Sequence, residues 1–146
     1  MNELIRMVYV STSTNPVKSE LGHINKDIGR ILMQSRRNNP MLKIGGVLYF
    51  NNNYYFQCLE GEQEVVDKTY KRIKKDSRHT KIETLSVNTV NTRKFSNWSM
   101  KYVANKDIIN KFLHERALTE YNPYSFSEEI ITELLNLFIS EANTNN

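Results

Sequence analysis

A glutamine inside an apolar strand is the residue whose chemistry most needs an explanation. Gln57 stands in the run Tyr54–Leu59, which is typical of a buried strand. A buried primary amide without hydrogen-bond partners costs about 1–3 kcal/mol. Strand alternation places Gln57 on one face with Tyr55 and Leu59, and Cys58 on the other. The amide therefore needs polar partners on its own face.

Two other predicted strands could supply those partners. Tyr9 lies on one face of the first strand, and Trp98 and Met100 share a face of the last strand. If these faces coincide with that of Gln57, a phenol and a primary amide meet beside Met100 or Trp98. A phenol and an amide satisfy each other, so an ordinary hydrogen bond in a core would also explain the pattern.

Polar side chains also gather on one face of the first predicted helix. The face begins apolar and ends in amides at positions i, i+4, i+7 and i+8: Ile31, Ser35, Asn38 and Asn39. Asn38 and Asn39 could equally form an ordinary helix end.

The C-terminal end of the second predicted helix also combines apolar and polar side chains. Along its C-terminal end, Arg72, Asp76 and His79 occupy positions i, i+4 and i+7, and Arg78 is adjacent. They flank the aliphatic Ile73, which would face Ile31 if the two helices lie side by side. Two opposed aliphatic residues flanked by amides and cations suit a flat heteroaromatic ring that carries a phosphate.

The composition is that of an ordinary globular protein and excludes several kinds of site. The chain has 146 residues, 39% of them hydrophobic and 25% charged, which fits one domain with a sizeable core. A single cysteine excludes an intrachain disulfide and a multi-cysteine metal site, so we predict no metal. The sequence shows neither a signal peptide nor a membrane-spanning run, and we expect a cytoplasmic protein.

Charge is distributed unevenly along the chain. The net charge is +4, but residues 127–146 carry four Glu and no Lys or Arg, which leaves +8 on residues 1–126. Many of the cations lie in residues 68–81, KTYKRIKKDSRHTK. Such a run is typical of a solvated helix face, and the alternative is a site for phosphate or another anion.

The order of strands and helices predicts an α+β fold. Periodicity gives strands at 4–11, 43–50, 54–60, 82–90 and 97–104, and helices at about 19–37 and 63–75. Asn-Asn-Pro would end the first helix, Asn51–Asn53 would turn a hairpin, and Gly61 would end its second strand. We expect the last two strands to pair with each other. This β-α-β-β-α-β-β order resembles a ferredoxin-like sandwich with one added strand.

Two more helices follow these elements. One covers about 106–118, and the other starts near Ser125, where Ser125 and Glu128 would form a capping box. The second has a broad apolar stripe, made of Ile130, Ile131, Leu134, Leu135, Leu137, Phe138 and Ile139. We expect it to cover the sheet face that the first two helices leave bare.

Six short stretches resemble one known family. They are RMVYVS, QSRRNNP, IGGVLYF, FQCLEGE, IKKDSRH and FSNWSM, in this order from residue 6 to residue 100. Together they are similar to the BLUF family, small photoreceptor domains that bind flavin to sense blue light. The resemblance implies FAD held non-covalently, with its ring between the two helices.

The resemblance also implies a role for each matching residue. Tyr9 would donate an electron and a proton, and Gln57 would be the amide that switches between Tyr9 and the flavin. Trp98 and Met100 match the family's Trp-Ser-Met, whose outer side chains respond to the switch. The other contacts would be Asn39 at the polar edge of the ring, Asn38 and Ser35 nearby, Ile31 and Ile73 on its two faces, and Arg72, Asp76, Arg78 and His79 toward the ribityl and phosphate end. No net reaction occurs in the family, so we expect a switch and not an enzyme.

A photoreceptor of this size must signal by contacting something else. We expect a photosensor domain at 1–104, a helical cap or output segment at 105–142 and a disordered tail at 143–146. No fused cyclase or phosphodiesterase domain is expected. The expected partner is a transcription regulator, a separate enzyme or a second copy in a homo-oligomer.

Other functions explain the residues less well. KIGGVLYF faintly resembles an RNA-recognition signature, but Ile44 replaces a glycine, and Gly45 and Val47 stand where aromatic side chains would stack bases. Direct nucleic-acid binding is therefore not expected. An enzyme is disfavoured because the histidines are scattered and Cys58 fits an inert core position. A flavin-binding module without photoactivity is the remaining alternative.

Overall fold

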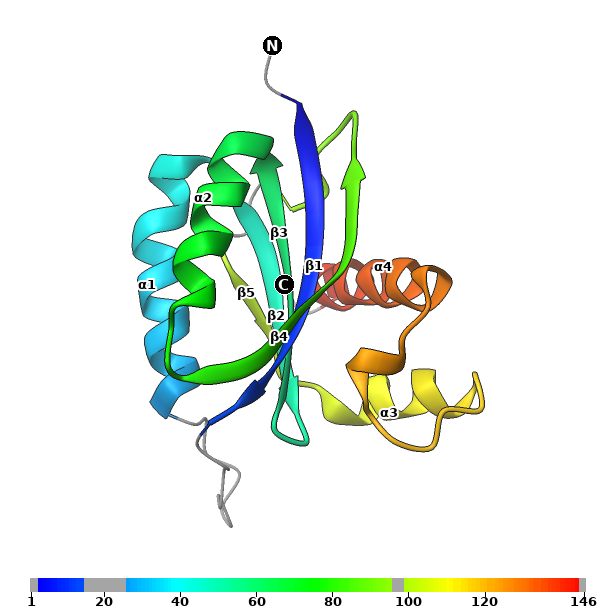
Figure 1. Ribbon diagram of the computed structural model, residues 1–146. Coiled ribbons are helices and arrows are strands. Elements are labelled where there is room, and N and C mark those ends of the chain that lie inside the picture. Colours follow the sequence, from blue (N-terminus) through cyan, green and yellow to red (C-terminus); the bar gives the residue numbers. More distant parts are fainter. Residues whose placement is uncertain (1–2, 15–25, 96–98, 145–146) are drawn as a thin grey trace.

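A mixed five-stranded sheet organises the fold (Figure 1). The computed structural model describes residues 3–14, 26–95 and 99–144. Its strands are β1 (Leu4–Ser13), β2 (Gly45–Asn51), β3 (Tyr54–Glu62), β4 (His79–Thr89) and β5 (Lys101–Val103), in the spatial order β4-β1-β3-β2-β5. Paired strands run antiparallel, except β2 and β5, which run parallel.

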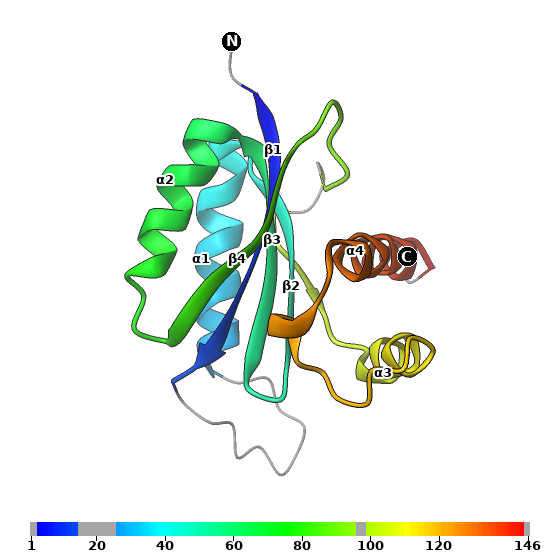
Figure 2. The same cartoon turned by 45° about the vertical axis from the view of Figure 1, so that its right-hand side comes forward.

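Helices cover both faces of the sheet, as predicted. Helices α1 (Lys26–Leu42) and α2 (Gln63–Lys74) lie on one face, and α3 (Lys106–His114) and α4 (Glu128–Thr144) lie on the other (Figure 2). A short 3₁₀ turn, η1 (Pro123–Ser125), precedes α4. This arrangement confirms the α+β sandwich with two C-terminal helices on the opposite face. Among the described residues, no helix has the length and apolar character needed to cross a membrane.

Strand alternation divides the interior into two cores. Along β3, Tyr55 and Leu59 contribute to the core under α1 and α2, whereas Phe56 and Cys58 contribute to the core under α3 and α4. Cys58 is fully buried, and burial raises the pKa of its thiol. The cysteine is therefore an inert core residue, as predicted.

The hairpin between β2 and β3 turns where the sequence predicts. Asn52 and Asn53 adopt φ angles of 51° and 67°, the left-handed region that asparagine tolerates well. Asn51 then pairs with Tyr54, which sets the register of both strands. As a result, Gln57 lies opposite Leu48 on β2 and opposite Tyr9 on β1.

The prediction that Asn-Asn-Pro ends the first helix is wrong. Helix α1 continues through Pro40 to Leu42, and residues 19–25 of the predicted helix lie outside the described residues. Pro40 is exposed in the last turn, where water can replace the hydrogen bond that proline removes. The helix ends at Leu42, and Lys43 follows with a φ of 54°. The Ile44 amide donates to the Asn39 carbonyl at 3.0 Å.

Gly61 does not end β3, contrary to the prediction. It pairs with Ile5 and continues the strand to Glu62. A Cβ atom at this position would lie 3.2 Å from the Lys43 carbonyl oxygen. The glycine therefore permits a close approach of the chain that follows α1, and it marks no turn.

The last two strands do not pair with each other, which corrects another prediction. β4 pairs with β1 at one edge of the sheet, and β5 pairs with β2 at the other. Local patterns identify strands but not their partners, because pairing is a non-local property. β4 begins at His79, earlier than predicted, and β5 covers only Lys101–Val103.

The C-terminal helices differ from the prediction at their ends. α3 ends at His114, well before residue 118, and Ala117 follows with a φ of 60°. The hydroxyl that caps α4 belongs to Ser127, which accepts from the Ile130 amide at 3.2 Å. Ser125 lies in η1 and donates to the Asn122 carbonyl. α4 extends to Thr144, and residues 145–146 lie outside the described residues.

Candidate functional site

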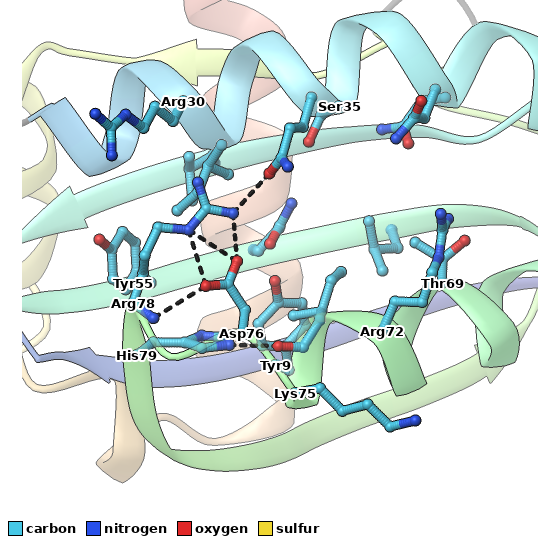
Figure 3. A pocket seen from close by; sticks show the side chains of 18 of the residues that line it. Tyr9, Arg30, Ser35, Tyr55, Thr69, Arg72, Lys75, Asp76, Arg78 and His79 are labelled. Carbon is cyan, nitrogen blue, oxygen red and sulfur yellow. Dashed lines mark hydrogen bonds and ion pairs between the residues drawn. The ribbon is translucent and has the colours of Figure 1, made fainter.

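A cavity of about 630 Å³ lies between α1, α2 and the sheet (Figure 3). This volume is in the range of pockets that bind small molecules and cofactors. Its lining includes every predicted cofactor contact except Met100, namely Tyr9, Ile31, Ser35, Asn38, Asn39, Gln57, Arg72, Ile73, Asp76, Arg78 and His79. The structure thus brings together residues that the sequence separates widely.

The floor of the cavity is formed by three neighbouring strands. Register places Tyr9 on β1, Gln57 on β3 and Leu48 on β2 side by side. The Gln57 amide is buried, and its Nε2 donates to the Met100 Sδ at 3.5 Å. A thioether is a weak acceptor, so this contact holds the amide only loosely. The predicted faces of β1, β3 and the last strand coincide at Met100, whereas Trp98 lies outside the described residues.

Tyr9 is held as a neutral phenol. The residue is 2% exposed, and burial raises the pKa of its hydroxyl well above the usual value of 10, with smaller contributions from Tyr70 and Asp76. The Tyr70 ring lies 5.2 Å away between centroids, and the His79 ring lies 6.4 Å away at a steep angle. Tyr9 therefore keeps its proton at neutral pH.

The two helices supply apolar walls with polar groups near them. Ile31 on α1 and Ile73 on α2 are both half-buried, and both line the cavity. Thr69 is buried on α2, and its hydroxyl has no hydrogen-bond partner among the described residues. Asn39 is 4% exposed, and its amide donates to the Ser99 carbonyl at 2.6 Å. A slot with this lining would accept a flat ring with polar edges.

The mouth of the cavity carries cations (Figure 3). Arg30, Arg72 and Lys75 are exposed residues of its lining. Arg78 is bound to Asp76 through an ion pair and also donates to the Gln34 side chain at 2.6 Å. Hydrogen bonds from the Arg78 side chain hold the pKa of the Asp76 carboxyl below its usual value. The exposed cations at the mouth suit the phosphates of a ligand whose ring lies deeper.

His79 is engaged by protein groups on both sides of its ring. Its Nε2 lies 2.6 Å from the Ile73 carbonyl, and its Nδ1 lies 2.9 Å from the Ser11 hydroxyl. A carbonyl only accepts, so Nε2 carries a hydrogen and donates. His79 thus fastens the C-terminal end of α2, and with it Ile73, to β1.

Several lining residues are absent from the sequence prediction: Arg30, Gln34, Leu48, Tyr55, Leu59, Thr69, Lys75 and Ser77. Arg30 and Gln34 lie eight and four positions before Asn38, so helical spacing from Asn38 could have indicated both. Leu48 can be assigned to the cavity only once its pairing with Gln57 is known. No sequence signal shows that the Thr69 hydroxyl lacks a partner.

The cavity therefore fits the cofactor that the sequence resemblance implies. Apolar side chains on two sides suit a flavin ring, the unpartnered Thr69 hydroxyl and the Gln57 amide offer polar contacts, and the cations suit phosphates. Among the described residues, no group of three or more His, Cys, Asp or Glu could hold a metal ion.

A family model and several solved structures match this chain. The family model BLUF, described as sensors of blue light using FAD, matches residues 4–101. The solved structure titled BlsA photo-activated state has a TM-score of 0.84 and 34% identity, and the match covers 93% of this chain and 94% of that chain.

Curated relatives match over a smaller part of their own length. The blue light- and temperature-regulated antirepressor BluF of Escherichia coli is 32% identical over 91 residues, which are 62% of this chain and 21% of that protein. The photoactivated adenylate cyclase subunit beta of Euglena gracilis is 30% identical over 98 residues, which are 66% of this chain and 11% of that protein. The chain therefore spans a small fraction of the curated relatives that it matches.

Proposed function

Because the chain belongs to the BLUF family of sensors of blue light using FAD, we propose that it is itself a blue-light sensor. The chromophore of the family is a flavin, and we propose FAD, held non-covalently in the cavity between α1 and α2. The observation that carries the proposal is the row formed by neutral Tyr9, Gln57 and Met100 under this cavity. Arg30, Arg72 and Lys75 at the mouth favour a ligand with phosphates.

The proposed contacts follow the lining of the cavity. Ile31 and Ile73 pack against the two faces of the ring, and Asn39 bonds its polar edge with Ser35 and Asn38 nearby. The groups proposed for the ribityl and phosphate end are Arg72, Asp76, Arg78 and His79. Arg78 and His79 act there through the contacts that hold the mouth and the end of α2 in place.

The proposed switch uses the chemistry of two side chains. Bound flavin supplies the absorption of blue light and an excited state that accepts an electron. Tyr9 releases an electron together with its phenolic proton, because a buried tyrosinate or an isolated cation would be costly. Gln57 exchanges its donor and acceptor ends, since its amide can serve as both. Its contact with Met100 then changes, while Tyr9 recovers its electron and proton.

The switch causes no net reaction, so we propose sensing and not catalysis for this chain. The relatives include an antirepressor and adenylate cyclases. Signalling by contact with a transcription regulator, a separate enzyme or a second copy of the chain is consistent with both kinds of relative. The segment 105–142 is the proposed output element, and 1–104 is the proposed sensor.

The test is spectroscopic. We expect the purified protein to carry FAD and to show a reversible red shift of the flavin bands under blue light. Tyr9→Phe deletes one hydroxyl and keeps the ring, so FAD should stay bound while the red shift disappears. Gln57→Leu should behave likewise, and Asn39→Ala should weaken flavin binding.

Tyr70→Phe is the matched control. It removes a neighbouring hydroxyl, which bonds to Thr84 at 2.8 Å and does not line the cavity. The red shift should persist in this variant. A colourless protein that takes up no added flavin would contradict the proposal, and bound flavin without a red shift would indicate a flavin-binding module without photoactivity.

A further inference from the structure

Glu60 is a fully buried carboxylate that does not line the cavity. It lies on β3 three residues after Gln57 and on the opposite face of the sheet. Its Oε1 accepts from the Phe95 amide at 2.9 Å, and its Oε2 accepts from the Lys94 amide at 3.0 Å. Arg6 on β1 completes the set through Nε at 2.9 Å and an ion pair at 2.8 Å. A buried carboxylate with this many donors forms strong, directional bonds.

The two amides that Glu60 binds belong to the connection from β4 to β5. β4 forms one edge of the sheet and β5 forms the other. The connection runs against the sheet at Gly45, where a Cβ atom would lie only 2.0 Å from the Phe95 carbonyl oxygen. Arg93 adds a bond to the Lys43 carbonyl at 2.6 Å. The beginning of the connection is therefore held by side chains.

The far end of the connection carries Met100 to the cavity. Asn39 donates to the Ser99 carbonyl at 2.6 Å, and Arg36 donates to the Met100 carbonyl at 3.2 Å. β5 itself pairs with β2 over only three residues, Lys101–Val103. Such a short parallel ladder holds a strand weakly. The position of Met100 beside Gln57 thus depends on the side chains that fasten the connection.

We infer that Glu60 is a positioning residue that sets the contact between Met100 and Gln57 from the opposite face of the sheet. The carboxylate holds the Lys94 and Phe95 amides, which precede Met100 by six and five residues. Glu60 does not line the cavity. Its effect on the switch is therefore transmitted through the connection. The inference deepens the proposed function and rests on it for its consequence in signalling.

The test observes Met100 directly. In protein labelled with ¹³C at the methionine methyl groups, Glu60→Gln should shift or broaden the Met100 signal in the dark. Met33 and Met41 are 66% and 87% exposed, and their signals should stay unchanged as internal controls. Amide exchange at residues 99–103 should accelerate about tenfold or more, the equivalent of one lost charge-assisted hydrogen bond. The dissociation constant of FAD should change less than about threefold, because Glu60 is remote from the cavity.

Glu64→Gln is the matched control, since it makes the same charge change at an exposed site on α2. It should alter neither the Met100 signal nor exchange at residues 99–103. If Glu60→Gln does not fold, Arg6→Lys is the milder variant, because it keeps a positive charge but loses the planar fork. It should give the same pattern with smaller changes.

The inference is overturned if either variant accelerates exchange at residues 94–95 while the Met100 signal and residues 99–103 stay as in wild type. The same measurements on flavin-free protein give a readout that needs no photochemistry. A wild-type protein without a red shift would contradict the proposed function, whereas an unmoved Met100 signal would contradict the role of Glu60 alone.

Discussion

The Thr69 hydroxyl lowers the stability of the folded protein unless a ligand fills the cavity. Its hydroxyl is buried in the wall of the cavity and has no hydrogen-bond partner among the described residues. A buried hydroxyl without a partner costs about 1–3 kcal/mol. A threonine in a helix usually bonds to a backbone carbonyl one turn earlier, as Thr132 does with Glu128. The Thr69 hydroxyl lines the cavity, where we expect a bound ligand to accept or donate its missing hydrogen bond.

Thr69→Val should therefore change two quantities in opposite directions. Valine keeps the shape and removes the unsatisfied hydroxyl, so flavin-free protein should gain up to about 1 kcal/mol in free energy of unfolding. The dissociation constant of FAD should rise about fivefold to tenfold, because one hydrogen bond is lost. Urea unfolding and flavin fluorescence measure the two effects. Thr132→Val, at an exposed position of α4, is the control. A Thr69→Val variant with unchanged FAD affinity would contradict the role of the Thr69 hydroxyl.

The residues that sequence reasoning could identify are those that periodicity places on one face. Tyr9, Gln57 and Met100 follow strand alternation, and Ile31 and Ile73 follow helical spacing, so each could be assigned to the cavity face. Contacts made by backbone groups could not be predicted. The ring of His79 bonds to the Ile73 carbonyl, and this depends on where α2 ends relative to β1.

Elements could be recognised more reliably than their ends or partners. Helix α1 continues beyond Pro40 because water reaches its last turn. Strand β3 continues beyond Gly61 because the chain at Lys43 packs closely against this glycine. Both residues are common terminators, but their local preference is overridden by packing. The sequence pattern predicts β4 and β5 as neighbours, yet they lie on opposite edges of the sheet. Their separation requires the long connection that Glu60 and Arg93 fasten.

Strand β5 is the element that links the proposed sensor to the C-terminal helices. Met100 precedes it on the cavity side, and Val103 packs in the core that contains Leu134 and Phe138 of α4. We therefore expect a change at Gln57 to shift this strand and the packing of Val103 behind it. Coupling of about 1–3 kcal/mol would change the affinity of a partner several-fold or more.

Met100→Ala should weaken this coupling. FAD binding and much of the red shift should remain, because Met100 does not line the cavity. The light-dependent change in hydrogen exchange of residues 106–142 should become smaller, since Gln57 loses its contact with Met100, which directly precedes β5. Met33→Ala, at an exposed position of α1, is the control. Equal exchange of residues 106–142 in wild type in the dark and in the light would show that the signal leaves by another surface.

The two cores of the described residues are packed differently. Under α3 and α4, large aromatic residues such as Tyr49, Phe56 and Phe138 pack against each other. Under α1 and α2, a cavity of about 630 Å³ remains. A ligand that binds only the folded state stabilises it, by about 2.7 kcal/mol at a hundredfold excess over its dissociation constant. Flavin-free protein should accordingly be the less stable form.

Buried tyrosines in both cores also make the free energy of unfolding depend on pH in the alkaline range. Burial raises the pKa of Tyr9 and of Tyr121 well above 10, whereas tyrosine in an unfolded chain titrates near 10. Between these values the unfolded state binds fewer protons than the folded state, so the free energy of unfolding falls as pH rises. Below pH 10 both states are protonated, and the contribution to stability is fully present.

Tyr121→Phe tests this dependence away from the flavin site. Tyr121 is 4% exposed, and its hydroxyl has no hydrogen-bond partner among the described residues. The loss of stability above pH 10 should become shallower by about 1.4 kcal/mol per pH unit, the value for one titrating group. At neutral pH the variant should be as stable as wild type or more stable, since an unsatisfied buried hydroxyl is removed. Urea unfolding of the flavin-free protein at pH 8, 10 and 11 measures both effects. Equal slopes for the variant and wild type would show that Tyr121 titrates in the folded state, which would require its hydroxyl to reach water.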